Sequence, residues 1–152
     1  MPGELDLNTL LREMRPVLDE AAYVFASVPA ALVAERRPTY LGLFHEAEGM
    51  TLTLSPAEAG RLGLPTTPQW AHITLAVHSS LSAVGFMARI AIALAAAGIS
   101  LNPVAGFYHD HLFVPWSDRH QALVVLRQLA QMGPGGARHH TCDHGDRSCP
   151  RV

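Results

Sequence analysis

The stretch FYHDHLFVPW (residues 107–116) places Asp110 between His109 and His111, directly before an apolar run. If a strand continued through them, the two imidazoles would project from one face and could bind a metal ion together. A metal site needs one or two further ligands. Candidates are His45, in a matching hairpin, and His72 and His78. Alternatively, Asp110 accepts a hydrogen bond from a ligand amino group, or simply caps a turn, while the histidines are structural.

A second candidate is the segment Ser79-Ser80-Leu81, which joins an expected strand to an expected helix. Backbone N–H groups and the positive end of the helix dipole favour a carboxylate at such a place. A serine hydroxyl can add a hydrogen bond to it. The alternative is that the two serines only cap the helix. Gly85 either allows close approach of a ligand or lets the helix pack tightly.

A third candidate is the pair Glu46 and Glu48, which flank Ala47 before Gly49. At strand spacing their carboxylates share one face, where either could pair with a ligand ammonium. The alternative is a solvated hairpin turn in which Gly49 takes a positive φ.

The elements that must position these residues can be read from the sequence pattern. The second half is clearest: a strand at 71–78, a helix at 82–97 ended by Gly98, two strands around the Tyr-His-Asp-His turn, and a helix that Ser117 caps. The first half repeats strand, polar turn, strand, serine cap and helix, without room for a long helix after its first strand. Its expected elements are a helix near 7–14, a strand at 23–28, a hairpin at 40–54, a helix at 55–62 and a linker at 62–69.

Composition limits the classes of function. The chain has 152 residues and a net charge of −2 without a basic run, which argues against nucleic acid as a partner. The most apolar stretch, residues 84–99, is too short for a membrane span and contains Arg89. Without a signal peptide pattern, and with Cys142 and Cys149 as its only cysteines, the chain is expected in the cytoplasm.

The segments VHSSLSAVGFMARIAIALAAAGISLNPVAGFYHDHLFVP and FHEAEGMTLTL closely resemble two consecutive parts of bacterial ACT-domain proteins, over about residues 5 to 130. The resemblance implies an α+β fold of two ferredoxin-like (βαββαβ) units, antiparallel sheets with helices on one face, and the first unit degenerate. It places an N-terminal ACT-like domain at 5–66 and a C-terminal ACT domain at 70–132. The resemblance does not cover residues 133–152, which are rich in glycine, histidine and charge without periodicity and are therefore expected to form a flexible tail. It also implies a homodimer or tetramer, formed through sheet edges or helices.

ACT domains generally bind amino acids and regulate another activity, commonly through the first strand–helix loop. The resemblance therefore implies an amino-acid-like ligand, no cofactor and no catalysis. The animal arginine sensors, which are similar, use the aspartate of the HDH-like motif. They also carry an acidic residue where this chain has Ala83, so a smaller or apolar amino acid fits better than arginine. The predicted ligand-binding residues are Ser79, Ser80, Leu81, Val84, Gly85, Asp110, Glu46, Glu48 and Gly49.

Three alternatives stay open. The chain is a structural oligomerisation module with a vestigial pocket, or an enzyme using Ser79 or Ser80 with His78 or His109 and Asp110, although no catalytic motif accompanies them. The third is a metal-binding protein. Its ligands would come from the tail residues His139, His140, Cys142, His144 and Cys149, whose spacing matches no standard zinc finger.

Overall fold

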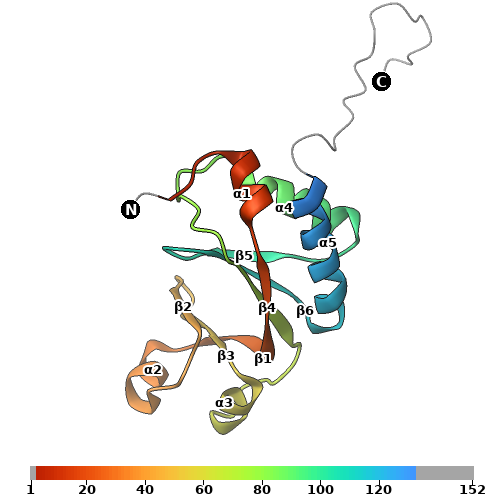
Figure 1. Ribbon diagram of the computed structural model, residues 1–152. Helices are drawn as coiled ribbons and strands as arrows, with labels where there is room; N and C mark the ends of the chain where they lie inside the picture. The colour runs from red at the N-terminus through yellow and green to blue at the C-terminus, as the bar shows by residue number, and fades with distance from the viewer. Residues whose placement is uncertain (1–2, 133–152) are drawn as a thin grey trace, which may run out of the picture.

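The computed structural model describes residues 3–132, and its elements alternate between strands and helices (Figure 1). The five predicted metal ligands of the tail lie outside the described residues. In chain order the elements are α1 (Leu7–Glu13), β1 (Pro16–Val28), α2 (Ala30–Arg36), β2 (Gly42–His45), β3 (Met50–Leu54), α3 (Pro56–Arg61), β4 (Trp70–Leu75), α4 (Phe86–Ala96), β5 (Asn102–Ala105), β6 (Asp110–Pro115), the short 3₁₀ helix η1 (Trp116–Asp118) and α5 (Arg119–Met132).

All described strands belong to one antiparallel sheet of six strands, in the order β2-β3-β1-β4-β6-β5. The long strand β1 joins the two halves of the chain. Its last residues, Val24–Val28, pair with β3, whereas Pro16–Leu18, Ala22 and Tyr23 pair with β4. An irregularity between Leu18 and Ala22 lets the strand change direction. The two halves therefore share one continuous sheet.

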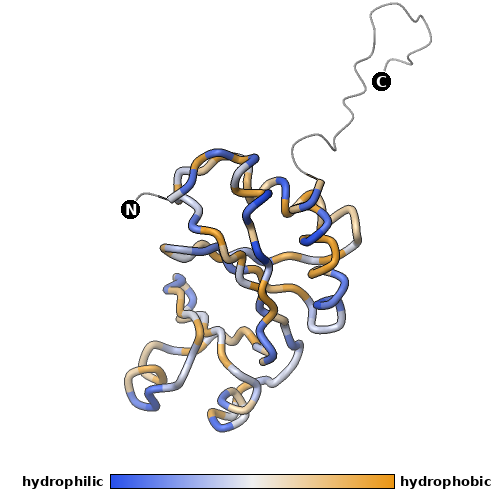
Figure 2. Tube along the Cα trace, in the orientation of Figure 1, coloured by the Kyte–Doolittle hydropathy of each residue, from blue (hydrophilic) through white to orange (hydrophobic). Residues whose placement is uncertain are grey.

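The helices cover one face of this sheet. Val24 of β1 packs in a core with α2 and α3, whereas Ala71 of β4 packs in a second core with α4 and α5. Ala22 pairs with Ala71 and lies two residues before Val24, so both cores are on the same side. The predicted α+β class, with antiparallel strands and helices on one face, is confirmed. Figure 2 shows hydrophilic residues at the β2–β3 turn and at the outer ends of α2 and α3, away from the sheet.

Helix α1 belongs spatially to the second half of the chain. Its residues Leu10 and Leu11, with Met14 just beyond it, are buried in the core that α4 and α5 form. Figure 1 shows α1 beside α4. The sequence ranges 5–66 and 70–132 thus do not correspond to two separate cores, because the first range supplies a helix and half a strand to the second.

Several elements differ from the sequence-based expectation. The last helix begins at Arg119 and is not capped by Ser117, because Ser117 lies within η1, where its hydroxyl donates to Asp118. Strand β1 begins at Pro16 and not at residue 23, because its first half, which contains Asp19 and Glu20, is held by pairing with β4. Helix α2 occupies a stretch expected to hold no element, and ends at Arg37, whose backbone is left-handed (φ 45°). Helix α4 begins at Phe86 and not at residue 82, because Gly85 (φ 89°) interrupts the helical backbone. None of the described helices is long and apolar enough to cross a membrane.

Candidate functional site

A small cavity of about 170 Å³ lies between the loop after β4, the start of α4 and the β5–β6 hairpin. We call it the Ser79 pocket. The Ser79 hydroxyl donates a hydrogen bond of 2.8 Å to Oδ2 of Asp110, and Ser79 is only 8% exposed. Asp110 lies on the helix side of the sheet, because the next residue but one, Leu112, is in the core. The residues that line the pocket are Ser79, Ser80, Leu81, Ala83, Phe86, Met87, Ala105 and Asp110.

The loop that carries the serines is fixed by the N-terminal segment. The Glu4 N–H donates to the His78 carbonyl (2.8 Å), and the Ser80 N–H donates to the Glu4 carbonyl (2.9 Å). A side chain on Gly3 would not fit, since its Cβ would lie 2.6 Å from the Ser79 carbonyl carbon. The segment thus needs glycine at position 3 to pack against the loop.

The expectation that Ser79 and Ser80 cap the helix is wrong. Their backbone N–H groups are already bonded, that of Ser79 to the Val77 carbonyl at 3.0 Å and that of Ser80 to Glu4. The residue that caps α4 is Gly85, which makes no side-chain hydrogen bond. The N–H groups that the first turn of α4 can offer are therefore those after Gly85, next to Phe86 and Met87 in the pocket wall.

The other predicted residues lie elsewhere. Val84 is 84% exposed and does not line the pocket, whereas Leu81, 69% exposed, stands at its rim. Glu46, Glu48 and Gly49 form the β2–β3 turn, where the Glu46 N–H donates to the Gly49 carbonyl (2.8 Å) and the Glu46 carboxylate accepts from the Thr51 hydroxyl. The predicted site residues are thus divided between two places in the fold.

A larger cavity, of about 460 Å³, lies on the face of the sheet opposite the helices. We call it the open-face pocket. All six strands or the turns next to them contribute to it. Of the predicted ligand-binding residues it contains only Glu46, together with His72 and His111, which were candidate metal ligands. Its lining residues are Phe25, Leu41, Gly42, Leu43, Phe44, Glu46, Thr51, Thr53, His72, Val104, His111 and Phe113.

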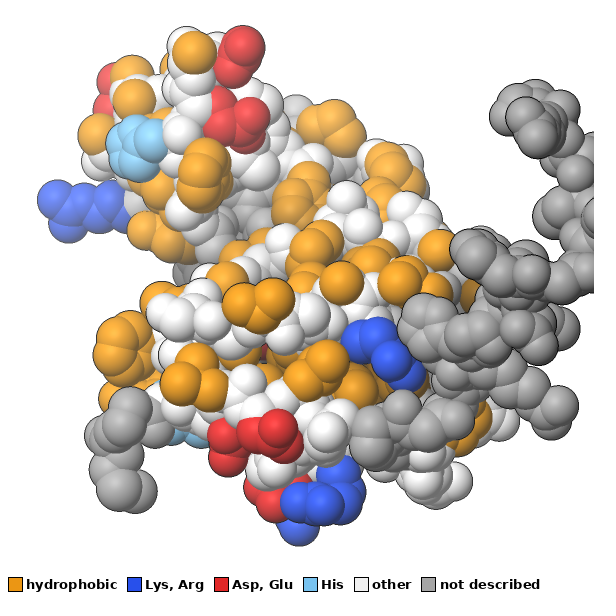
Figure 3. All heavy atoms as spheres, turned by 90° about the horizontal axis from the view of Figure 1, so that it is seen from above, with side chains coloured by type: hydrophobic (Ala, Val, Ile, Leu, Met, Phe, Trp, Pro, Cys, Tyr) orange, Lys and Arg blue, Asp and Glu red, His pale blue; other side chains and the backbone are white. Residues whose placement is uncertain are grey.

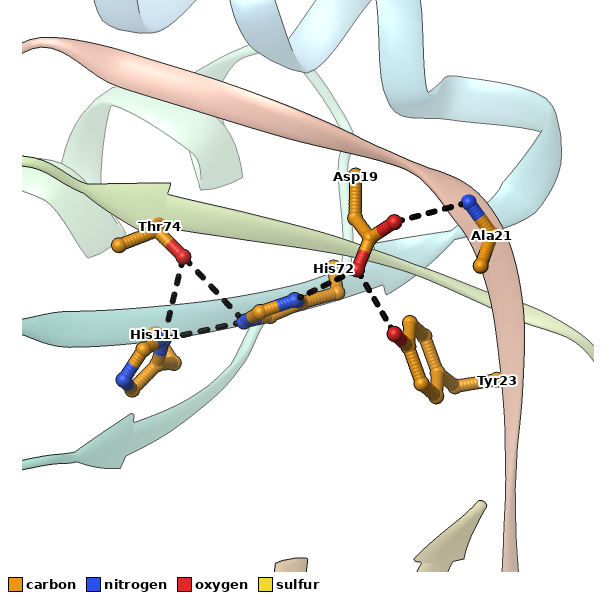
Figure 4. Close-up of polar contacts among 6 residues, drawn as sticks. All are labelled: Asp19, Ala21, Tyr23, His72, Thr74 and His111. Atoms are coloured by element: carbon orange, nitrogen blue, oxygen red, sulfur yellow. Dashed lines mark hydrogen bonds and ion pairs between the residues drawn. The ribbon is translucent and has the colours of Figure 1, made fainter. Parts of the chain in front are cut away.

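A polar network runs along one side of this pocket (Figure 4). Nε2 of the buried His72 lies 3.0 Å from Nδ1 of His111, and Nδ1 of His72 lies 3.5 Å from Oδ2 of Asp19. The same oxygen accepts from the Tyr23 hydroxyl at 2.7 Å, and the Ala21 N–H donates to the other carboxylate oxygen at 2.9 Å. Figure 4 shows these side chains meeting from β1, β4 and β6.

The network shifts the pKa of several of its members. Burial opposes ionisation of Asp19, but hydrogen bonds from the Ala21 N–H, Tyr23 and His72 outweigh it, so the pKa of Asp19 lies below its usual value. Burial and then the hydrogen bond to Asp19 raise the pKa of Tyr23 to about 12. Burial, and then the neighbouring His72, lower the pKa of His111. At neutral pH the network therefore holds a charged carboxylate and a neutral His111.

Two family models of the ACT domain match the sequence in tandem, at residues 2–70 and at residues 67–128. The chain belongs to the ACT-domain family. A crystallised protein of unknown function from Vibrio cholerae, described as a possible transport protein, is 42% identical to it, with a TM-score of 0.74 over 82% of this chain and 96% of that one. Among curated proteins, none matches the chain significantly.

Two more distant structures show the same fold. The regulatory subunit of aspartate kinase from Thermus flavus is 16% identical (TM-score 0.57, 76% of this chain and 95% of that one). The ligand-free regulatory subunit from Thermus thermophilus is 13% identical (TM-score 0.60, 78% and 97%). The predicted arrangement of two ferredoxin-like ACT units in tandem is confirmed, and the family supports a regulatory role in ligand binding.

Within the second ACT unit, the three residues of the HDH motif contact three different partners. Nδ1 of His109 is 3.1 Å from the Val77 carbonyl, Asp110 accepts from Ser79, and His111 reaches His72 on the other face. Across residues 3–132 no three His, Cys, Asp or Glu side chains are arranged to hold a metal ion. Ser79 does not pair with a histidine, because its hydroxyl is directed to a carboxylate, and the Ser80 hydroxyl accepts from the Ser82 N–H at 3.2 Å.

Sequence reasoning missed the open-face pocket almost entirely. Its floor is built from every second residue of strands whose other residues form the cores. The sequence signal that could have revealed it is this alternation along each strand. In AHITLAVH the polar residues His72 and Thr74 interrupt an apolar strand, and in DHLFVP His111 and Phe113 alternate with the core residues Leu112 and Val114. These four residues pair across β4 and β6 on the open face.

Proposed function

We propose that this protein is a regulatory sensor without catalysis of its own, which binds a small amino acid or a similar compound in the Ser79 pocket. The observation that carries the proposal is the Asp110 carboxylate, held by the Ser79 hydroxyl beside the first turn of α4. The carboxylate suits a ligand ammonium, and the backbone N–H groups of the helix start suit a ligand carboxylate. An α-amino acid carries both of these charged groups on a single carbon atom.

The size and lining of the pocket favour a small side chain on the ligand. At about 170 Å³ it lies below the usual range of roughly 300–1,000 Å³ for larger ligands. Asp110 is the only acidic residue in its wall, and Ala83 stands where the arginine sensors that the chain resembles carry an acidic residue. We therefore expect glycine, alanine, serine or a branched amino acid to bind better than arginine.

The surface around the pocket suits contact with a second copy of the chain. Leu81, Val84 and Ile92 are large apolar residues exposed near or along α4. Figure 3, which views the protein from above α1 and α4, shows hydrophobic side chains over much of the visible surface. A homodimer or tetramer that buries these side chains would close the pocket rim. We expect the protein and the partner that it regulates in the cytoplasm.

Thermal unfolding with each of the twenty amino acids at 10 mM tests the proposal. A ligand that binds only the folded state at 100 times its Kd stabilises it by about 2.7 kcal/mol, which is a clear rise in Tm. Asp110→Asn should abolish the rise, whereas Glu20→Gln, which removes an exposed carboxylate on β1, should preserve it. If no amino acid raises Tm, or if Asp110→Asn keeps the rise, the proposed site is refuted.

A further inference from the structure

The open-face pocket has the features of a ligand site and is separate from the Ser79 pocket. Its volume of about 460 Å³ falls within the usual range for small-molecule sites, and most of its lining is apolar. Aromatic rings form much of the wall: Phe25 and Phe113 pack edge to face with centroids 5.1 Å apart, and Phe44 is exposed at the mouth. A few polar side chains, namely His72, His111, Thr51, Thr53 and Glu46, are set among them.

The network beneath the pocket determines which hydrogen bond His111 can make. The charged Asp19 carboxylate can only accept, so the facing Nδ1 of His72 carries the proton. Nε2 of His72 is then the acceptor of the pair, and Nδ1 of His111 donates to it over 3.0 Å. Because His111 is neutral, its remaining nitrogen Nε2 has a free lone pair and is an acceptor. His111 is partly exposed and lines the pocket, and its Nε2 lies beside Gly106 of the β5–β6 turn, at the edge of the pocket.

The charge around the pocket points to the same kind of ligand. Its lining contains no lysine or arginine, and its one formally charged residue is Glu46 at the β2–β3 turn. A carboxylate and an imidazole acceptor favour a group that donates hydrogen bonds and carries positive charge. The faces of Phe25 and Phe44 add a cation–π contribution of roughly 0.5–1 kcal/mol where a cation approaches them.

We propose that the open-face pocket binds a small protonated amine with an aromatic or branched apolar body, independently of the Ser79 pocket. The apolar body fills the space between the phenylalanine rings, and the ammonium donates to the Glu46 carboxylate or to Nε2 of His111. An organic carboxylate of the same shape is disfavoured, since it would face acceptors and no cation. The proposal does not depend on the amino-acid site, which lies across the sheet.

Three probes of one shape test the charge requirement: 2-phenylethylamine, 2-phenylethanol and 3-phenylpropanoate, titrated by calorimetry at pH 7.5. The amine is expected to bind most tightly and the carboxylate most weakly. Glu46→Gln should weaken the amine about two- to fivefold, the effect of an exposed ion pair, and leave the alcohol unchanged. Glu48→Gln removes the same charge from the same turn but outside the pocket, and should change neither. Equal affinity for all three probes would overturn the proposal.

A filling variant tests the location. Gly42 lines the pocket, and a Cβ there would meet Thr53 Oγ1 at 3.7 Å, an ordinary contact, so Gly42→Phe places a ring in the space without backbone strain. It should abolish amine binding, whereas Asp110→Asn, in the other pocket, should preserve it. In the wild type, nitrogen NMR should show His111 protonated at Nδ1, with its Nε2 signal shifted by the amine.

Two outcomes would contradict the proposal in different ways. Amine binding that survives Gly42→Phe would place the amine elsewhere. If no probe binds, and sedimentation shows a dimer that Phe44→Ser dissociates, the open face is instead an interface between two copies of the chain.

Discussion

Replacing Leu10 by alanine tests the sharing of elements between the two halves of the chain. Leu10 lies in α1, near the N-terminus, yet it is 0% exposed and packs in the core of α4, α5, β4 and β6. A buried leucine shortened to alanine loses transfer free energy and leaves a cavity, at a cost of about 2–5 kcal/mol. Because the side chain is fully buried between helices, we expect about 3 kcal/mol or more, against a total stability of roughly 5–15 kcal/mol.

Urea unfolding, followed by the fluorescence of Trp70 and Trp116, measures this loss. Leu5→Ala is the matched control, since Leu5 is 59% exposed and should change stability by less than about 0.5 kcal/mol. Amide hydrogen exchange then locates the effect, which is expected in α4 and α5. A loss below about 1 kcal/mol, or faster exchange confined to β2, β3, α2 and α3, would show that α1 does not belong to the second core.

Three further predictions concern single groups. The charged hydrogen bond between Ser79 and Asp110 should give a coupling of about 1–2 kcal/mol in a double-mutant cycle with alanine, measured by urea unfolding, and a coupling near zero would contradict the contact. Gly85→Ala forces a side chain into φ 89° and should cost about 1–2 kcal/mol, whereas Gly60→Ala, within helix α3, should not destabilise the protein; equal effects would exclude backbone strain as the cause. His111 has a lowered pKa when folded, so its contribution to stability is full above about pH 6.5 and is lost as the pH falls towards the folded pKa. His111→Phe should reduce this loss of stability, and an unchanged pH profile in thermal unfolding would show that another group titrates.

Elements set by local chemistry could be predicted from the sequence. The helix at Pro56 begins as expected, with the Ser55 hydroxyl accepting from the Glu58 N–H at 3.2 Å. The β2–β3 hairpin turns at Glu46–Gly49, where a Cβ on the glycine would lie 2.9 Å from the Val28 carbonyl. Caps and turns are decided by a few neighbouring residues, so short patterns are enough to find them.

Elements set by distant partners could not be predicted. The first half of β1 is strand because β4 lies beside it, which its own polar residues do not indicate. Ser79 and Ser80 resemble an N-cap in the sequence. In the structure the Ser80 N–H donates to the Glu4 carbonyl, and α4 begins only at Phe86, with Gly85 as its N-cap. The Ser79–Asp110 contact joins residues that were both predicted as site residues, whereas the open-face pocket needs residues from all six strands or the turns next to them.

Asp110 and His111 are consecutive residues of β6, yet they face opposite sides of the sheet. One peptide unit of β6 thus separates a residue that lines the Ser79 pocket from a residue that lines the open-face pocket. Linkage requires that any effect of one proposed ligand on the affinity of the other be reciprocal, so the independence proposed above predicts a factor of one in both directions.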